Sequence, residues 1–187
     1  MNPPCVISNL QIGSVEATAS TGGKRWVEVE VEGAVYEIDD PRLMLNIFQN
    51  QCQTGCSSTW WLDDNEASLL AEFLSDAAKG VEQQQLEHIG SLAGKDSSGI
   101  ETNPWLTITV QQNNSRPNAN SVGVHLHFDD ELIQETENDG ILWLSGDSAR
   151  HLSRFLSEAI ERKATHPPHI YVPPQPGNVV IASAIAN

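Results

Sequence analysis

Two histidines and an aspartate on one predicted strand are the residues whose types and spacing best fit catalytic chemistry. His125, His127 and Asp129 alternate with Leu126 and Phe128, so on a strand the three polar side chains project from one face. Alternate strand positions lie about 6.6–6.8 Å apart, a spacing from which two imidazoles can converge on one metal ion. The pattern favours a metal-dependent hydrolase, with the third ligand supplied by Asp129 or by a neighbouring strand.

A plainer interpretation stays open, because histidines on the wet face of an amphipathic strand are often ordinary surface residues. The remaining reactive groups predict no chemistry. Cys52 and Cys56 lack a second ligand pair at zinc-finger spacing. Gly22-Gly23-Lys24 precedes a predicted strand, whereas a phosphate-binding loop opens a helix, so we predict a turn there. None of these patterns predicts a cofactor.

A row of carboxylates on an earlier strand favours binding over catalysis. Glu28, Glu30 and Glu32 alternate with valines, so they share the face opposite the apolar one. Carboxylates at regular intervals resemble the charges of a nucleic-acid backbone and predict a contact with a basic groove on another protein. A solvated strand face is the alternative. Further partner-binding candidates continue the acidic run or lie in the C-terminal segment: Glu37, Asp39, Asp40 and Tyr171.

Tyr171 belongs to a segment, 165–187, that carries five prolines. Proline removes backbone donors and fixes φ, so the segment is predicted to be an extended tail with an aromatic anchor. Its apolar end, Val179 to Ile185, could add a strand to a sheet edge in this protein or in another. A loose terminus is the alternative.

The chain carries a formal charge of −15, from 25 acidic and 10 basic residues. Such a surface repels nucleic-acid phosphates and anionic membranes, so direct nucleic-acid and membrane partners are disfavoured. A basic partner, such as a nucleic-acid-binding protein, is favoured, although acidity also serves solubility alone. The three cysteines fit no disulfide framework, and neither a leader peptide nor an apolar span is predicted. We therefore expect a cytoplasmic protein with reduced thiols.

Segments 61–78 and 143–160 are two gapless copies of one pattern, 82 positions apart (61 to 143). Most of the shared positions are apolar and fall on one helical stripe, so the repeat preserves a packing surface. The polar faces differ, because the first helix is acidic and the second is mostly basic. The identical pairs are Trp61/Trp143, Leu62/Leu144, Ala67/Ala149, Leu70/Leu152, Phe73/Phe155, Leu74/Leu156, Ser75/Ser157 and Ala77/Ala159.

Strands are predicted before each helix. In the first copy they fall at 26–32 and 35–38, which form a hairpin, and at 58–62, with 42–51 open to either structure. In the second copy they fall at 106–110, 122–128 and 140–144. Asp63 with Glu66 predicts a capping box for the first helix, and Ser145 predicts the cap of the second. Each helix is expected to cover its own copy's sheet. Residues 81–93 are predicted to form a further helix.

The strand followed by Trp61-Leu62-x4-Ala67-x2-Leu70, repeated as Trp143-Leu144-x4-Ala149-x2-Leu152, resembles the C-terminal module of small uncharacterised actinobacterial and actinophage proteins. The likeness covers under a quarter of the chain. This sequence departs from that pattern by doubling the module and by lacking a Cys/His-rich N-terminal segment. The resemblance implies a bacterial or phage origin and no activity.

These observations predict an α+β protein of two tandem antiparallel β-meander-plus-helix repeats that form a pseudo-twofold body. The predicted organisation is a first repeat over 1–93, a linker over 94–104, a second repeat over 105–164 and the tail. The leading functional prediction is a non-enzymatic acidic adaptor or inhibitor, with a nucleic-acid mimic of phage or mobile-element origin as one form of it. The metal-dependent hydrolase and a structural subunit of a larger assembly, including a homo-oligomer, are the alternatives.

Overall fold

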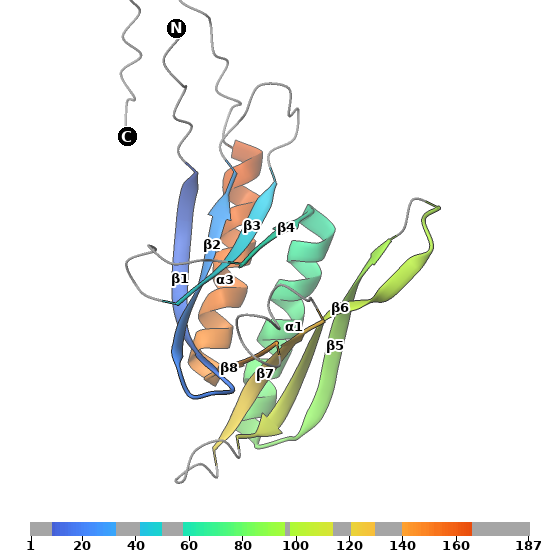
Figure 1. Ribbon diagram of the computed structural model, residues 1–187. Coiled ribbons are helices and arrows are strands. Elements are labelled where there is room, and N and C mark those ends of the chain that lie inside the picture. Colours follow the sequence, from blue (N-terminus) through green and yellow to red (C-terminus); the bar gives the residue numbers. More distant parts are fainter. Residues whose placement is uncertain are drawn as a thin grey trace, which may run out of the picture.

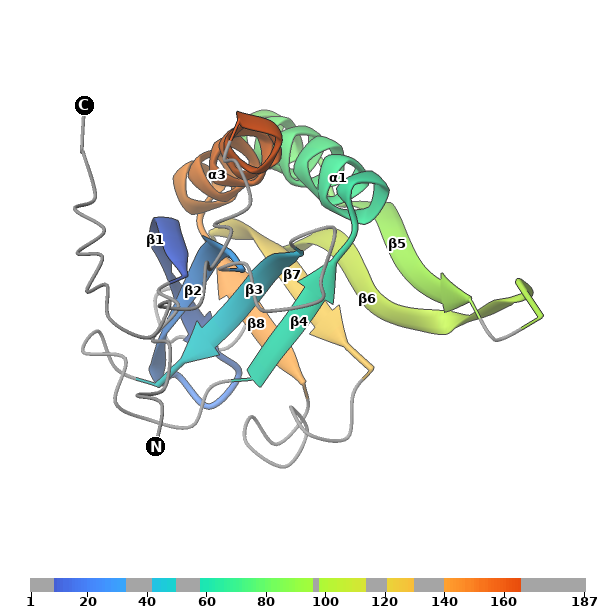
Figure 2. The same cartoon turned by 90° about the horizontal axis from the view of Figure 1, so that it is seen from above.

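In the described residues, an antiparallel sheet carries two helices on one face (Figures 1 and 2). The computed structural model describes residues 9–32, 42–49, 58–95, 98–113, 121–129 and 140–165 of the 187-residue chain. The α+β class predicted from the sequence is confirmed. The elements are β1 (Leu10–Ala19), β2 (Lys24–Val31), β3 (Leu43–Phe48), β4 (Ser58–Leu62), α1 (Asp64–Gln83), β5 (Glu87–Lys95), β6 (Glu101–Gln112), β7 (Val122–Phe128), β8 (Ile141–Leu144) and α3 (Gly146–Thr165).

Both helices begin where their caps were predicted. The Asp63 carboxylate accepts a hydrogen bond from the Glu66 backbone N–H at 2.8 Å, and the Glu66 carboxylate accepts one from the Asp63 N–H at 3.0 Å. At α3, the Ser145 hydroxyl accepts from the Ser148 N–H at 3.0 Å. Each cap satisfies backbone donors that have no partner inside the helix, which is why the chain turns helical at these points.

The eight strands of the described residues follow the order β4-β3-β2-β1-β8-β7-β6-β5. Each half of the chain thus forms a four-stranded meander, and the two meanders meet where β1 pairs with β8. That junction is short and antiparallel, with Thr18 opposite Trp143 and Ala19 opposite Leu142. The strands β4 and β5 consequently lie at the two ends of the sheet.

The two meanders have matching cross-strand partners. The β1/β2 ladder has an irregularity at Gln11/Gly13, and the β5/β6 ladder has a matching one at His88/Gly90. The β5/β6 ladder has two further shifts, at Leu92/Ala93 and Ala93/Lys95, that β1/β2 lacks. In both halves apolar residues face each other at the same steps along the ladder. The matching pairs are Val27↔Ile47 and Leu106↔Phe128, Val29↔Leu45 and Ile108↔Leu126, Val31↔Leu43 and Val110↔Val124, and Leu43↔Leu62 and Val124↔Leu144.

The helices do not cover the strands that precede them, so the prediction that each helix covers its own copy's sheet is wrong. Figure 2 shows α3 over β1 and β2 and α1 beside β5 and β6, in agreement with their contacts. The ring of Phe155 on α3 lies against Gly13 of β1, and the ring of Phe73 on α1 lies against Gly90 of β5. Each half of the sheet is therefore covered by the helix from the other half of the chain.

Chain connections explain this exchange. Only residues 84–86 join α1 to β5, and so short a connection holds the helix beside the strand that follows it. The helix α3 comes directly after β8, which lies next to β1 at the middle of the sheet. Sequence periodicity reveals which helical face is buried, but it does not reveal which strands that face covers.

Replacing Gly90 by alanine should destabilise the fold by about 1–3 kcal/mol, because a Cβ there would lie 2.4 Å from the ring of Phe73. The φ angle of Gly90 is not positive, so the loss is steric. Urea unfolding should show that Phe73→Leu relieves the defect of Gly90→Ala, since the smaller side chain leaves room for the methyl group. Phe155→Leu is the matched control. Equal relief by both substitutions would contradict the observed placement of the helices.

Two predicted elements between the halves are wrong. The extra helix over 81–93 is absent, because α1 ends at Gln83, Gln84 takes a left-handed cap with φ 55°, and β5 begins at Glu87. The expected linker 94–104 is instead the end of the β5–β6 hairpin. Local patterning missed this strand, which pairs with β6 along its length, because strand formation depends on such neighbours more than on local preference. Within the segment 42–51, which the sequence left open, residues 43–48 form a strand.

The buried side chains of both halves form a single hydrophobic cluster. An aromatic group ties the first half to the second within it. The ring centroid of Trp60 on β4 lies 4.7 Å from that of Phe128 on β7 and 6.4 Å from that of Trp105 on β6. The predicted hairpin strand at 35–38 and the proline-rich tail lie outside the described residues.

Candidate functional site

A groove of about 420 Å³ runs between α1 and α3. The lining residues recur at steps of three and four along each helix, so each helix contributes one face to the groove. Small side chains form the floor, and one glutamate from each helix lines the groove. The lining residues are Ser68, Ala71, Glu72 and Ser75 from α1, with Ser153, Ser157, Ile160 and Glu161 from α3.

Two of the residues that line this groove form a direct hydrogen bond between the helices. The Ser153 hydroxyl donates to the Ala71 carbonyl at 2.6 Å, and these two residues occupy the same position in the repeated pattern. The helices run antiparallel, since Val81 of α1 lies against Gly146 of α3 and Lys163 of α3 binds Asp64 of α1. Small residues at the crossing allow the two backbones to approach closely.

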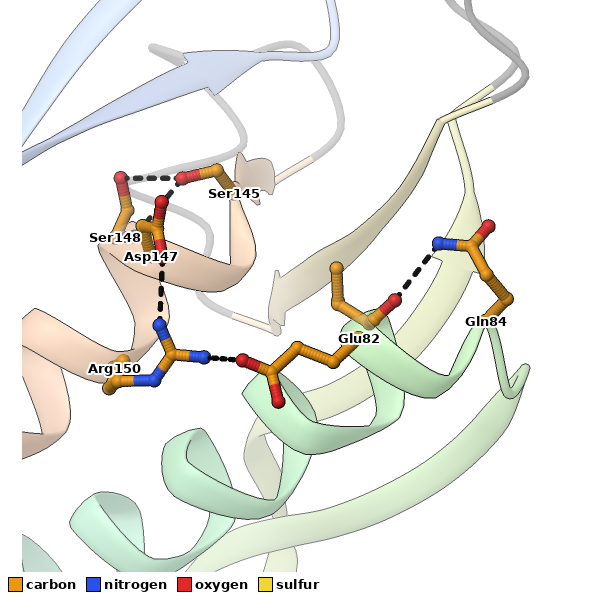
Figure 3. Close-up of polar contacts among 7 residues, drawn as sticks. Glu82, Gln84, Ser145, Asp147, Ser148 and Arg150 are labelled. Carbon is orange, nitrogen blue, oxygen red and sulfur yellow. Dashed lines mark hydrogen bonds and ion pairs between the residues drawn. The ribbon is translucent and has the colours of Figure 1, made fainter.

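At each end of the helix pair, a basic residue of α3 forms an ion pair with an acidic residue of α1. Arg150 of α3 binds Glu82 of α1 and also Asp147 at 2.7 Å, and the nearby Ser145 and Ser148 hydroxyls bond each other (Figure 3). At the other end, the 2.9 Å pair between Lys163 and Asp64 is partly shielded, because the Lys163 side chain is 8% exposed.

Along the helices, two more pairs lie within the same element: Lys79 with Asp76 at 2.8 Å, and Arg162 with Glu158 at 3.5 Å. The hydrogen bond from Lys79 to Asp76 raises the pKa of Lys79, and the charge of Glu72 also favours its protonated form. The guanidinium of Arg154 lies 5.7 Å from the ring of Phe155. The basic residues of the two helices thus have partners on the helices themselves.

The predicted acidic row does not present three carboxylates to solvent. Glu28 is 1% exposed, and Gln11 donates a hydrogen bond to it. The Glu30 carboxylate accepts from Asn46 at 3.1 Å, and Glu32 forms a 3.3 Å pair with Arg42. Alternation correctly placed the three on one face, but that face is partly covered, so a uniform charged row is excluded.

The histidine pair has the predicted orientation but a different environment. His125 and His127 share one face of β7, with ring centroids 6.4 Å apart. His125 Nδ1 lies 3.3 Å from the Thr109 hydroxyl, and its ring centroid lies 4.7 Å from that of Trp143. Within the described ranges, no group of three His, Cys, Asp or Glu residues could hold a metal ion. Asp129 therefore brings no third ligand to the pair in the described geometry.

Several predicted residues lie outside the described part of the chain: Glu37, Asp39, Asp40, Tyr171 and the three cysteines, Cys5, Cys52 and Cys56. The groove itself was missed by sequence reasoning. A signal for it was present, because Ser75 and Ser157 are identical in the two copies and lie beside the buried stripe. A shared polar residue next to a packing face indicates a position near a second helix.

No helix in the described ranges combines the length with the apolar character that crossing a membrane requires. No family model, curated protein or solved structure matches the chain.

Proposed function

We propose that this protein is a non-enzymatic acidic binding protein that engages a basic surface of a protein partner through the groove between α1 and α3. The observation that carries the proposal is the placement of Glu72 and Glu161 at a groove whose other lining side chains are serines, an alanine and Ile160. The helix α1 contributes five acidic residues and one lysine, whereas α3 contributes three acidic and four basic residues. The pair is therefore net negative on a chain that is itself strongly acidic.

A lysine or arginine side chain fits this site chemically. Its methylene stem can lie along the Ser, Ala and Ile160 surface while its charged end reaches a carboxylate. Arginine adds geometric selectivity, because its guanidinium binds a carboxylate through two parallel hydrogen bonds. Nucleic-acid-binding proteins carry clusters of such side chains, so they are the proposed class of partner. Toward such a partner, the protein would act as an adaptor or an inhibitor, and its proposed origin is bacterial or phage.

We further propose that the body is a tandem duplication with pseudo-twofold symmetry. Three observations support it. The cross-strand partners of the two meanders match, the ring-on-glycine contacts are equivalent in the two halves, and Ala71 bonds the residue at its own repeat position, Ser153. A contact between equivalent positions is what a residue near a twofold axis makes.

Binding to an arginine-rich peptide should weaken by about tenfold, or about 1.4 kcal/mol, in the double variant Glu72→Gln/Glu161→Gln. Isothermal titration calorimetry at low salt measures this affinity, and raising the salt concentration should weaken binding by the parent protein more than by the variant. A glutamate-rich peptide should not bind.

The charge-matched control is Glu16→Gln/Glu101→Gln, which removes two exposed carboxylates from strands. This control should retain most of the affinity, because its charges are not at the groove. If the two double variants weaken binding equally, net charge alone attracts the peptide and the groove is not the site.

A further inference from the structure

The exposed large apolar side chains of the described residues lie at or near the two ends of the sheet. The large hydrophobic residues most exposed in the described ranges are Trp61 at 50%, Leu69 at 39%, Leu86 at 57% and Ile100 at 65%. Trp61 belongs to the end strand β4. Leu86 directly precedes the other end strand, β5, and Ile100 lies in the hairpin that follows it.

Leu69 also belongs to the β5 end, because it lies one helical turn before Phe73, whose ring contacts Gly90 of β5. Figure 2 shows the β5–β6 hairpin reaching out beyond the helices. Among the described residues, β4 pairs only with β3, and β5 pairs only with β6. On its outer side, each end strand has no neighbouring strand among the described residues, and exposed apolar side chains lie near it. These two features together mark a surface for strand pairing.

The junction in the middle of the sheet indicates what these ends would pair with. By the matching ladders, β8 corresponds to β4 and β1 corresponds to β5. The β1/β8 pairing inside the molecule therefore has an equivalent. If each strand is replaced by its counterpart, the equivalent pairing joins β5 to β4. Within the described ranges of one chain that second pairing is not made, because β4 and β5 are the two ends of the sheet.

The register of the second contact follows from the first. Trp143 stands opposite Thr18 in the existing junction. Its counterpart on β4 is Trp61, and counting five residues on from Gly13 and Gly90 makes Lys95 the counterpart of Thr18. Trp143 is half-buried against His125, whereas Trp61 is half-exposed, with the Arg42 guanidinium 5.2 Å from its ring centroid.

We propose that two copies of this protein associate head to tail, with β4 of one copy pairing antiparallel with β5 of the next and Trp61 opposite Lys95. The occupant of each sheet end is a second copy of this chain, because the chain already contains the same junction once. The inference rests on the correspondence of the strands and does not depend on a basic partner. The contact is heterologous, so it builds a ring or a filament unless two copies close on each other.

Sedimentation equilibrium tests the association. The average mass of the parent should rise above 20.4 kDa as the concentration is raised from about 1 μM to about 1 mM, the range expected for a short interface. Trp61→Glu should remain monomeric, because a charge on an edge strand opposes pairing. The control Thr21→Glu adds the same charge in an exposed turn and should associate like the parent. A parent that stays monomeric throughout overturns the proposal.

Disulfide trapping tests the register. In a background with Cys5, Cys52 and Cys56 changed to serine, the variants Trp61→Cys and Lys95→Cys are purified separately, and circular dichroism melting confirms that each is folded. Directly opposed strand residues lie within the Cα separation of a disulfide. Oxidation of the mixture should therefore give a covalent dimer containing one copy of each variant. A dimer that forms equally well in either variant alone, or no dimer in the mixture, overturns the head-to-tail contact.

Discussion

Phe128→Ala should lower the free energy of unfolding by about 3–5 kcal/mol, a large fraction of the total stability of a typical domain. The side chain is fully buried, and its ring lies 4.7 Å from that of Trp60, which comes from the other half of the chain. Truncation removes both the buried apolar area and the aromatic contact that joins β7 to β4. Urea unfolding followed by far-ultraviolet circular dichroism measures the change.

Two comparisons separate this explanation from a general sensitivity to mutation. Phe128→Leu keeps most of the volume and should lose less than half as much as the alanine variant. Ile100→Ala removes an apolar side chain that is 65% exposed, so it should change stability by less than about 0.5 kcal/mol. If Phe128→Ala unfolds at the same urea concentration as Ile100→Ala, the aromatic cluster does not hold the two halves together.

The cluster also shows which parts of the fold could be predicted from the sequence. Alternation on 122–128 correctly placed Leu126 and Phe128 on the buried face, because a strand with one covered face must alternate. It did not predict that Trp60 meets Phe128. That contact depends on how the two meanders are joined at β1/β8, and two ladder pairs between distant segments leave no local pattern.

The helices were predictable to the same extent. Capping residues and apolar stripes predicted where α1 and α3 begin and which faces are buried, because both depend on neighbours within a turn. The partner of each face is set by the connections, and the prediction there was wrong. Gly13 and Gly90 carried the missing information, since each leaves room for a phenyl ring. A glycine inside a strand indicates a close approach, but it does not name the ring that approaches, and Gly90 lay in a segment predicted to be helical.

The candidate site was only partly predictable for a similar reason. The sequence predicted that helix one presents an acidic face, and Glu72 lies on it. The groove needs a second helix beside the first, and the contribution of Glu161 could not be predicted without knowing that the helices are adjacent. For Glu28, Glu30 and Glu32, the sequence predicted a solvent-facing row of carboxylates that the structure does not have. The pattern is regular, yet burial of Glu28 depends on residues distant in the sequence, such as Gln11.

Leu74→Ala and Leu156→Ala should each lower the free energy of unfolding by about 2–5 kcal/mol, and the two losses should be similar. These leucines hold the same position in the repeated helices, and both are fully buried. Similar losses follow from the proposed duplication, because each leucine would occupy an equivalent cavity. Urea unfolding of the two variants, with Leu69→Ala as an exposed control that loses less, measures the comparison.

The shape of the transitions distinguishes one body from two independent domains. The eight strands of the described residues form one sheet, and buried residues from both halves belong to one hydrophobic cluster, so each variant should unfold in a single transition, with the same m value as the parent. The exchange of helices between the halves strengthens this coupling. A substitution that loosens α1 weakens its packing on β5, and one that loosens α3 weakens its packing on β1. A two-step transition in Leu74→Ala, with one half of the signal retaining the parent's midpoint, would show that the halves fold separately and that the exchange of helices does not couple them.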